Sequence, residues 1–157
     1  MKPSRGLRLV LLACAASWLA SCAAQPPPQA VLELAVTGSA GQNPDPSGAP
    51  APVAVHLYQL ASTAKFGRAD IFALIEHEQA TLGTDLLGSD EFVIAPSEQR
   101  AVQQTLKAGT QALGVAVLFQ DIDRAQWRAV APVGASGTTK LLLDVGKLSV
   151  SLKPAGQ

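Results

Sequence analysis

The sequence predicts an all-β domain, an antiparallel β-sandwich with a small helical insertion near its N-terminal end. Short runs of alternating or branched apolar residues recur along the chain, and glycine- or proline-containing turns separate them. One early segment shows apolar residues at helical spacing instead. When a leader and a linker are subtracted, roughly 130 residues remain, which is close to the commonest size of one domain with a single core.

The first 21 residues have the anatomy of a secretory signal peptide that ends at a lipid-acceptor cysteine. A basic segment, Met1 to Arg8, precedes an apolar run from Leu9 to Leu19 that is too short to span a bilayer. Leu19-Ala20-Ser21-Cys22 follows at once and resembles the lipobox of bacterial lipoproteins, so we expect a covalent lipid on Cys22. Cys14 ends a looser lipobox, but the apolar core before it is only a few residues long.

Residues 22–30 are expected to hold the domain away from the membrane. Pro26, Pro27 and Pro28 lack N–H donors and favour an extended polyproline II spacer. The segment could instead bind a proline-recognising module, but a tether is the better interpretation beside a lipidated cysteine. Ala23 occupies the position where inner-membrane retention in enteric-type bacteria usually shows Asp, so the outer membrane is the expected destination.

The expected domain, residues 31–154, begins with two strands that flank a long loop. Val31–Thr37 is dense in branched apolar residues, and Val53–Leu60 alternates between apolar and other side chains. The connection from Gly38 to Pro52 contains four prolines and three glycines and has no apolar period. Loops longer than about 12 residues are usually functional or disordered, so this one is a candidate functional element.

A change of period then predicts one helix, and strand-like runs return after it. Between Phe66 and Glu78 apolar residues recur at helical spacings, and Asp70 can support the first turn. The strand-like runs that follow are Glu91–Ile94, Gln99–Leu106, Leu113–Phe119, Trp127–Val133, Lys140–Val145 and Leu148–Leu152.

Composition and motifs give no indication of an enzyme or of a nucleic-acid-binding protein. The chain has 12 basic and 12 acidic residues, but Lys2, Arg5 and Arg8 lie in the leader, so the mature protein is mildly acidic. Its basic residues are scattered, which makes nucleic acid an unlikely partner. The sequence contains no nucleophile elbow and no phosphate-binding loop, and we find no catalytic constellation.

Possible metal sites have simpler explanations, so no metal or cofactor is expected. Asn43–Gly48 superficially resembles a calcium loop, but its bidentate glutamate would fall at Ala54, and prolines constrain the coil between the ligands. A structured turn is expected there. His56 and His77 are the only histidines, and no cysteine is left in the core to complete a zinc site.

Two further pairs of residues have competing interpretations. Asp121 and Asp123 could be paired catalytic carboxylates, but at alternate positions after a strand they more plausibly organise a turn. Trp127 and Arg128 could form an interface hot spot. Alternation places Trp127 with Ala129, which favours a tryptophan that closes one end of the sandwich.

Six motifs follow one another along the mature chain: Asn43-Pro44-Asp45 with Gly48, Pro50 and Pro52; Tyr58-Gln59-Leu60; Phe66 with Ala69-Asp70-Ile71-Phe72; Leu82-Gly83-Thr84-Asp85-Leu86-Leu87; Pro96 before Glu98; and Asp121-Ile122-Asp123 before Trp127-Arg128. In this order, and behind a lipobox, they resemble the TssJ (SciN/VasD) family of type VI secretion lipoproteins across the mature length of the chain. The sequence departs from the family pattern at Ala49 and His56, where arginine is frequent, and at Ser97, where glycine is usual.

The resemblance implies a transthyretin-like sandwich of two antiparallel sheets, with a helical insertion and a protruding loop between the first two strands. It implies an outer-membrane lipoprotein without catalytic activity that binds the periplasmic C-terminal region of the inner-membrane protein TssM. The partner-binding loop would be Gly38–Pro52, with these expected contact residues: Asn43, Pro44, Asp45, Pro46, Ser47, Gly48 and Pro50.

The loop prolines have two interpretations, and the function has two alternatives. The loop prolines are compatible with partner binding, because they lower the entropy of an exposed segment before it binds. The alternative interpretation, less favoured here, is that they protect a neighbouring edge strand. A carrier of a small apolar ligand between the sheets and an envelope hydrolase with an unfamiliar site are the alternative functions.

Overall fold

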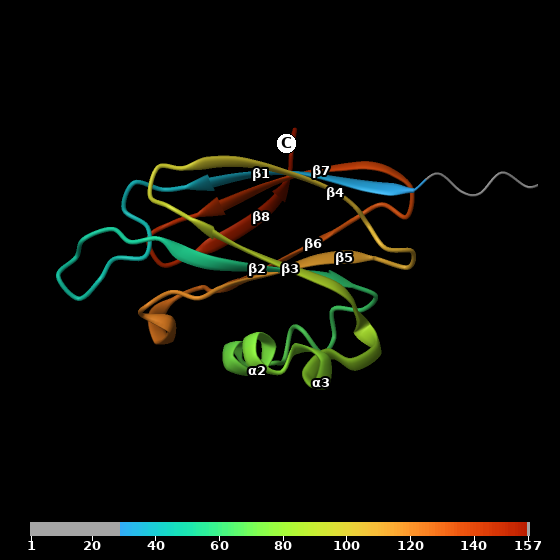
Figure 1. Cartoon of the computed structure of the whole chain (residues 1–157), viewed down its shortest axis with the longest axis horizontal. Helices are drawn as coiled ribbons and strands as arrows, with labels where there is room; N and C mark the ends of the chain where they lie inside the picture. The colour runs from blue at the N-terminus through green and yellow to red at the C-terminus, as the bar shows by residue number, and fades with distance from the viewer. Residues whose placement is uncertain (1–28, 157) are drawn as a thin grey trace, which may run out of the picture.

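The alternating runs form eight strands in the part of the chain that the computed structural model describes, residues 29–156 (Figure 1). Two four-stranded sheets pack face to face, with strand orders β4-β1-β7-β8 and β3-β2-β5-β6. The predicted two-sheet sandwich is confirmed. The strands are β1 (Ala30–Gly38), β2 (Val53–Leu60), β3 (Leu86–Ile94), β4 (Gln99–Thr105), β5 (Ala112–Val117), β6 (Arg128–Pro132), β7 (Gly137–Val145) and β8 (Val150–Pro154).

One ladder is parallel, whereas the sequence predicted antiparallel pairing. The register of β1 with β7 runs from Ala30 opposite Gly137 to Gly38 opposite Val145. Parallel neighbours need a crossover connection, and here the whole second sheet lies between the two strands along the chain. β1 is therefore an inner strand, bonded to β4 on one side and to β7 on the other.

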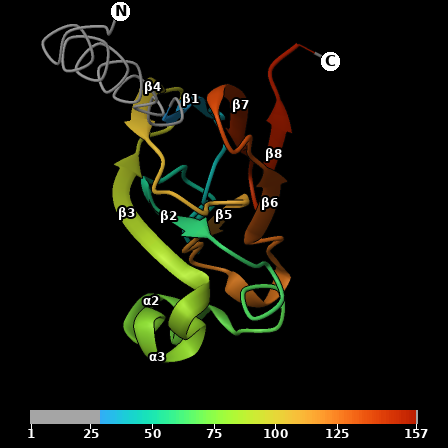
Figure 2. The ribbon, with the colours of Figure 1, turned by 90° about the vertical axis from the view of Figure 1, so that its right-hand side faces the viewer.

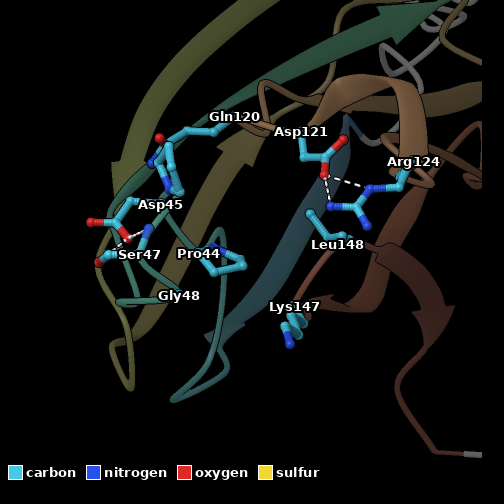
Figure 3. Close-up of a pocket in the computed structure, with 10 residues that line it drawn as sticks. Pro44, Asp45, Ser47, Gly48, Gln120, Asp121, Arg124, Lys147 and Leu148 are labelled. Carbon is cyan, nitrogen blue, oxygen red and sulfur yellow. Dashed lines mark hydrogen bonds and ion pairs between the residues drawn. The ribbon is translucent and has the colours of Figure 1, made fainter.

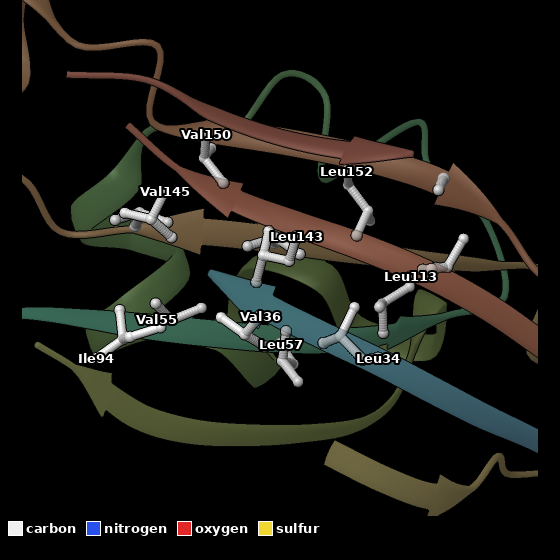
Figure 4. Packing of buried hydrophobic residues seen from close by; sticks show 14 of the residues in the cluster. Leu34, Val36, Val55, Leu57, Ile94, Leu113, Leu143, Val145, Val150 and Leu152 are labelled. Atoms are coloured by element: carbon white, nitrogen blue, oxygen red, sulfur yellow. The ribbon is translucent and has the colours of Figure 1, made fainter. Parts of the chain in front are cut away.

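The core lies between the sheets and follows from the alternation of the strands. Leu34 and Val36 on β1 face Val55 and Leu57 on β2, and all four side chains are at most 2% exposed (Figure 4). Because a strand directs alternate side chains to opposite faces, each apolar run supplies one half of this layer. β5 is buried at all six positions, since its other face is covered by the helical insertion.

The insertion contains two short helices where the sequence predicted one helix over Phe66–Glu78. Asp70 caps α2 (Ile71–Glu76), as expected, and its side chain accepts a hydrogen bond from the Ala73 amide at 3.0 Å. The helix ends at His77, whose φ of −136° is not helical, before α3 (Glu78–Leu82) and a 3-10 helix, η2 (Gly83–Asp85). Both helices lie against the outer face of the second sheet (Figure 2).

A second, smaller apolar cluster attaches the insertion to that face. Phe66 lies before α2 rather than inside a helix, is fully buried and packs against Tyr58 with ring centroids 5.4 Å apart. The Tyr58 hydroxyl donates to the Leu74 carbonyl of α2 at 3.2 Å. The same covering raises the pKa of Tyr58 above its ordinary value, chiefly because burial disfavours the phenolate.

Trp127, directly before β6, packs into the fold. It is partly buried and packs against both apolar clusters. The Arg128 guanidinium lies 4.4 Å from the centre of its ring, and Nη1 donates to the carbonyl oxygens of Phe66, Gly67 and Ala69. Arg128 therefore pins the insertion to β6.

Most strand boundaries agree with the predictions within three residues, and β3 is the exception. It begins at Leu86 rather than Glu91, because its first half is an edge segment whose Ser89 and Asp90 carry no apolar alternation. Ser97 adopts a positive φ of 63° in the β3–β4 turn, a conformation that glycine adopts more readily.

The N-terminal predictions lie outside the described residues. They concern the leader, Cys22 and the tether up to residue 28, which precede the first described residue. Within residues 29–156, no helix combines the length and the apolar character needed to cross a bilayer.

Candidate partner-binding loop

The loop between β1 and β2, residues 39–52, protrudes from one end of the sandwich (Figure 1). Its base is held by two adjacent polar side chains that are almost completely buried, Gln42 at 0% and Asn43 at 3% exposure. Buried polar groups cost stability unless they are hydrogen-bonded, so their partners show what they are for.

Asn43 connects the two ends of the loop to each other and the loop to two other segments. Its Nδ2 donates to the Pro52 carbonyl at 2.8 Å, and its Oδ1 accepts from the Gln120 amide at 2.8 Å. Its own amide donates to the Lys147 carbonyl at 2.9 Å. Asn43 has a φ of +44°, a left-handed conformation that asparagine tolerates better than most residues.

Gln42 ties the loop to the end of β3. Its Nε2 donates to the Ile94 carbonyl at 2.8 Å, and its Oε1 is buried without a hydrogen-bond partner. The side chain fits closely over Gly38, where an added Cβ would lie 2.4 Å from Oε1 and 2.5 Å from the Ala95 carbonyl oxygen. The sequence analysis did not single out Gln42. Its only local signal is a polar residue beside an asparagine that precedes a proline.

The tip of the loop, residues 44–50, is organised by the carboxylate of Asp45. Oδ1 accepts from the Ser47 hydroxyl at 2.6 Å, the Ser47 amide at 2.8 Å and the Ala49 amide at 3.0 Å. These bonds, with the Ser47 hydroxyl as the largest contribution, hold the pKa of Asp45 below its ordinary value of 3.8. Gly48 donates to the Asp45 carbonyl at 2.8 Å and has a φ of +87°, which suits glycine.

The expected contact residues therefore divide into two groups. Asn43 is buried and positions the loop, whereas Pro46, Ser47, Gly48 and Pro50 are exposed. Pro44 and Asp45 are half-buried. The candidate surface is thus a rigid tip on a doubly anchored base.

An open cleft of about 670 Å³ separates the loop from two neighbouring turns (Figure 3). Asp121 and the 3-10 helix η3 (Ile122–Arg124) line one wall, and Lys147 and Leu148 of the β7–β8 turn line another. Arg124 Nε donates to Asp121 at 2.6 Å, and this hydrogen bond lowers the pKa of the carboxyl group. Asp121 thus serves the turn before Trp127, in agreement with the preferred interpretation.

The candidate metal ligands are not gathered into a site. His56 Nδ1 lies 3.9 Å from the Glu91 carboxylate, and His77 occupies the junction of α2 and α3. One oxygen of the Asp45 carboxylate, Oδ1, accepts three hydrogen bonds from within the loop. No group of three histidine, cysteine or acidic side chains within residues 29–156 is placed to hold a metal ion.

The fold and the loop define a β-sandwich domain whose candidate site is a preorganised loop. The chain belongs to the family of type VI secretion lipoproteins: the family model described as "Type VI secretion lipoprotein, VasD, EvfM, TssJ, VC_A0113" matches residues 30–148. None of the curated proteins compared with the chain matches it.

Solved structures agree with this assignment. The T6SS lipoprotein TssJ1 from Pseudomonas aeruginosa is 36% identical, with a TM-score of 0.75 over 84% of this chain and 99% of that one. A chain in a structure described as "Type VI membrane complex" is 26% identical, with a TM-score of 0.70 over 81% of this chain and 99% of that one. A chain in "T6SS protein TssM C-terminal domain (869-1107) from EAEC" is also 26% identical, with a TM-score of 0.68 over 80% and 98%.

Proposed function

We propose that this protein is an outer-membrane lipoprotein that anchors a type VI secretion membrane complex by binding the periplasmic C-terminal region of TssM. In this role the lipid on Cys22 anchors the protein in the membrane, and the loop between β1 and β2 binds the partner. The observation that carries the proposal is the loop itself: a family member presents an exposed tip whose backbone is fixed before any partner arrives. Such preorganisation lowers the entropic cost of binding.

The match to a chain in the structure described as "T6SS protein TssM C-terminal domain (869-1107) from EAEC" supports TssM as the partner. The part of this chain that aligns is 80% of 157 residues, about 126, and it makes up 98% of the matched chain. The matched chain is therefore about half as long as the TssM fragment 869–1107. We infer that it is a lipoprotein-like domain present beside TssM rather than that fragment.

The membrane attachment follows from the leader. Cys22 ends a lipobox, and Ala23 behind it favours the outer membrane over the inner one. Each buried methylene contributes about 0.8 kcal/mol, so several acyl chains on one cysteine give stable anchoring. The role needs neither a catalytic group nor a cofactor beyond this covalent lipid.

The carrier alternative has less support. The space between the two sheets is filled by 19 buried apolar residues of the described chain (Figure 4). A carrier would need a cavity between the sheets for its ligand. The filled core instead makes the sandwich a rigid support for the loop.

Calorimetry with residues 24–157 and the periplasmic C-terminal region of the cognate TssM tests the proposal. We expect a Kd in the micromolar range or tighter, about −8 kcal/mol or stronger. Because Asp45 and Ala49 are hydrogen-bonded to each other, two glycines can replace residues 45–49 and close the loop; this tip variant should lose binding. A two-glycine replacement of Ala135 and Ser136, in the connection at the opposite end of the sandwich, should retain it.

The outcomes test separately whether the protein binds TssM and whether the loop is the binding surface. Binding that survives in the tip variant would keep the anchoring role and move the interface elsewhere. A folded wild-type domain that does not bind would contradict the proposal and favour the carrier. Lipidation is tested by Cys22→Ser, which should move the protein out of the membrane fraction, with Cys14→Ser as the control that stays.

A further inference from the structure

One row of side chains on the outer face of the second sheet is left uncovered by the helical insertion. It consists of Val93 on β3, Ala54 on β2 and Leu118 just beyond β5. Ala54 is the register partner of Val93, and the Leu118 amide donates to the Ala54 carbonyl at 3.0 Å. Val93 is 52% exposed and Leu118 is 37% exposed, and together with Ala54 they form a continuous apolar strip across three neighbouring strands, whereas Val130 on the same face is 40% exposed but stands apart from the loop.

The row is continuous with the base of the partner-binding loop. The loop is anchored to the carbonyls of Pro52 and Ile94 and to the amide of Gln120. Each of these anchor residues is one or two positions from a member of the row in the sequence. The three strand ends that hold the loop are therefore the same three that present the apolar side chains, so a partner seated on the loop meets a surface of fixed geometry.

The surroundings of the row define the chemistry of its occupant. Val93 and Leu118 flank the small Ala54 and lie roughly 10 Å apart, two strand spacings, so one or two apolar side chains can contact all three. Glu91 shares the face of β3 with Val93, and its side chain is 59% exposed. Its nearest basic group is His56 at 3.9 Å. A basic residue beside the apolar one would complement this carboxylate.

We propose that Ala54, Val93 and Leu118 extend the binding surface of the loop, and that TssM places an apolar side chain on this row with a basic residue opposite Glu91. The inference rests on the proposed function. It adds a dehydrated apolar centre, of the kind that carries most of the affinity in protein interfaces, to a loop tip that is mostly polar and proline-rich.

The test compares four substitutions of apolar residues whose exposed fractions lie between 37% and 52%. Val93→Asp and Leu118→Asp should each weaken the calorimetric Kd for the TssM region at least ten-fold. Val130→Asp on β6 and Leu142→Asp on β7, both at 40% exposure, are the matched controls and should change it less than two-fold. Glu91→Lys should weaken binding more at low salt than at high salt. Thermal unfolding of each variant shows that the domain is intact.

Each outcome decides one question. If the wild-type domain binds and the tip variant does not, while Val93→Asp and Leu118→Asp bind like the controls, the loop role stands and this inference is overturned. If the two substitutions instead dissolve a dimer of the lipoprotein seen by light scattering, the row is covered by a second copy, and the inference is also overturned. No binding by the wild-type domain removes the proposed function and this extension together.

Discussion

Replacing Asn43 by alanine should destabilise the domain by about 3 kcal/mol, although the residue lies in a surface loop. The substitution removes the hydrogen bonds to Pro52 and from Gln120, both at 2.8 Å. Each contributes a net stability of only about 1 kcal/mol, because it replaces hydrogen bonds to water that the unfolded chain makes. Alanine must also adopt the left-handed φ of +44°, which costs about another 1 kcal/mol.

A second variant separates the two contributions. Asn43→Gly loses the same two hydrogen bonds but adopts a positive φ without steric strain, so it should be more stable than Asn43→Ala by about 1 kcal/mol. Urea unfolding followed by the fluorescence of Trp127, the only tryptophan beyond the leader, measures both free energies. Calorimetry with the TssM region should show weaker binding for both variants, because a less ordered loop loses more conformational entropy when it binds.

The argument has a clear point of failure. If both variants unfold within about 0.5 kcal/mol of the wild type, the side chain of Asn43 does not hold the loop, and the distinction between base and tip is wrong. If only the alanine variant is destabilised, backbone strain and not hydrogen bonding accounts for the asparagine.

Three further predictions concern other parts of the molecule. Because the pKa of Asp45 is lowered in the folded protein, its contribution to the order of the loop is present above pH 3.8 and is lost as the pH falls through the folded-state pKa. NMR titration of the Asp45 carboxyl carbon should give a midpoint below 3.8, and a midpoint above 3.8 would contradict this prediction. Gly114→Ala should lower the free energy of unfolding by about 1–3 kcal/mol, because the new Cβ would lie 2.9 Å from the Leu60 side chain. Gly41→Ala is the control: its new Cβ would have no atom within 4 Å, so the same urea titration should show no change. Arg128→Lys should speed hydrogen exchange in residues 61–70, since one guanidinium binds three carbonyls there, and unchanged exchange would show that the apolar cluster alone holds the insertion.

Most strands were predictable because at least one face of each supplies apolar side chains to the core. β2 alternates along its sequence, and its inner side chains form the core. The first half of β3 was missed, since an edge segment with polar residues on its open side needs no such alternation. The parallel pairing of β1 with β7 was equally hidden, because register between distant strands leaves no local pattern in either of them.

The break in the helical insertion depends on tertiary contacts. Phe66 has a helical spacing to Ala69, yet it packs beneath β2 before α2 begins. Periodicity cannot distinguish a helix from a turn whose apolar residue is buried by another element. Asp70 was the informative residue, since its side chain caps α2 locally and does not depend on the rest of the fold.

The candidate site was predictable as a segment but not residue by residue. Length and proline content marked the loop, and the Asp45–Gly48 turn follows from local chemistry. The burial of Asn43 does not follow, because an asparagine before a proline is normally an exposed turn residue. Its partners at Pro52 and Gln120 come from two different strand ends that only the fold brings together.

The proposed role also gives a reason for the position of the loop relative to the anchor. The lipid would pull on the N-terminal end of β1, and the partner would pull on the loop that leaves its C-terminal end, so the load would run along this one strand. β1 is bonded over Val31–Thr37 to β4 and over Ala30–Gly38 to β7. A strand pulled along its axis must break these ladders together, whereas a strand pulled sideways at the edge of a sheet opens one bond at a time. An inner β1 between the tether and the loop therefore suits a protein that transmits force from its lipid to its partner.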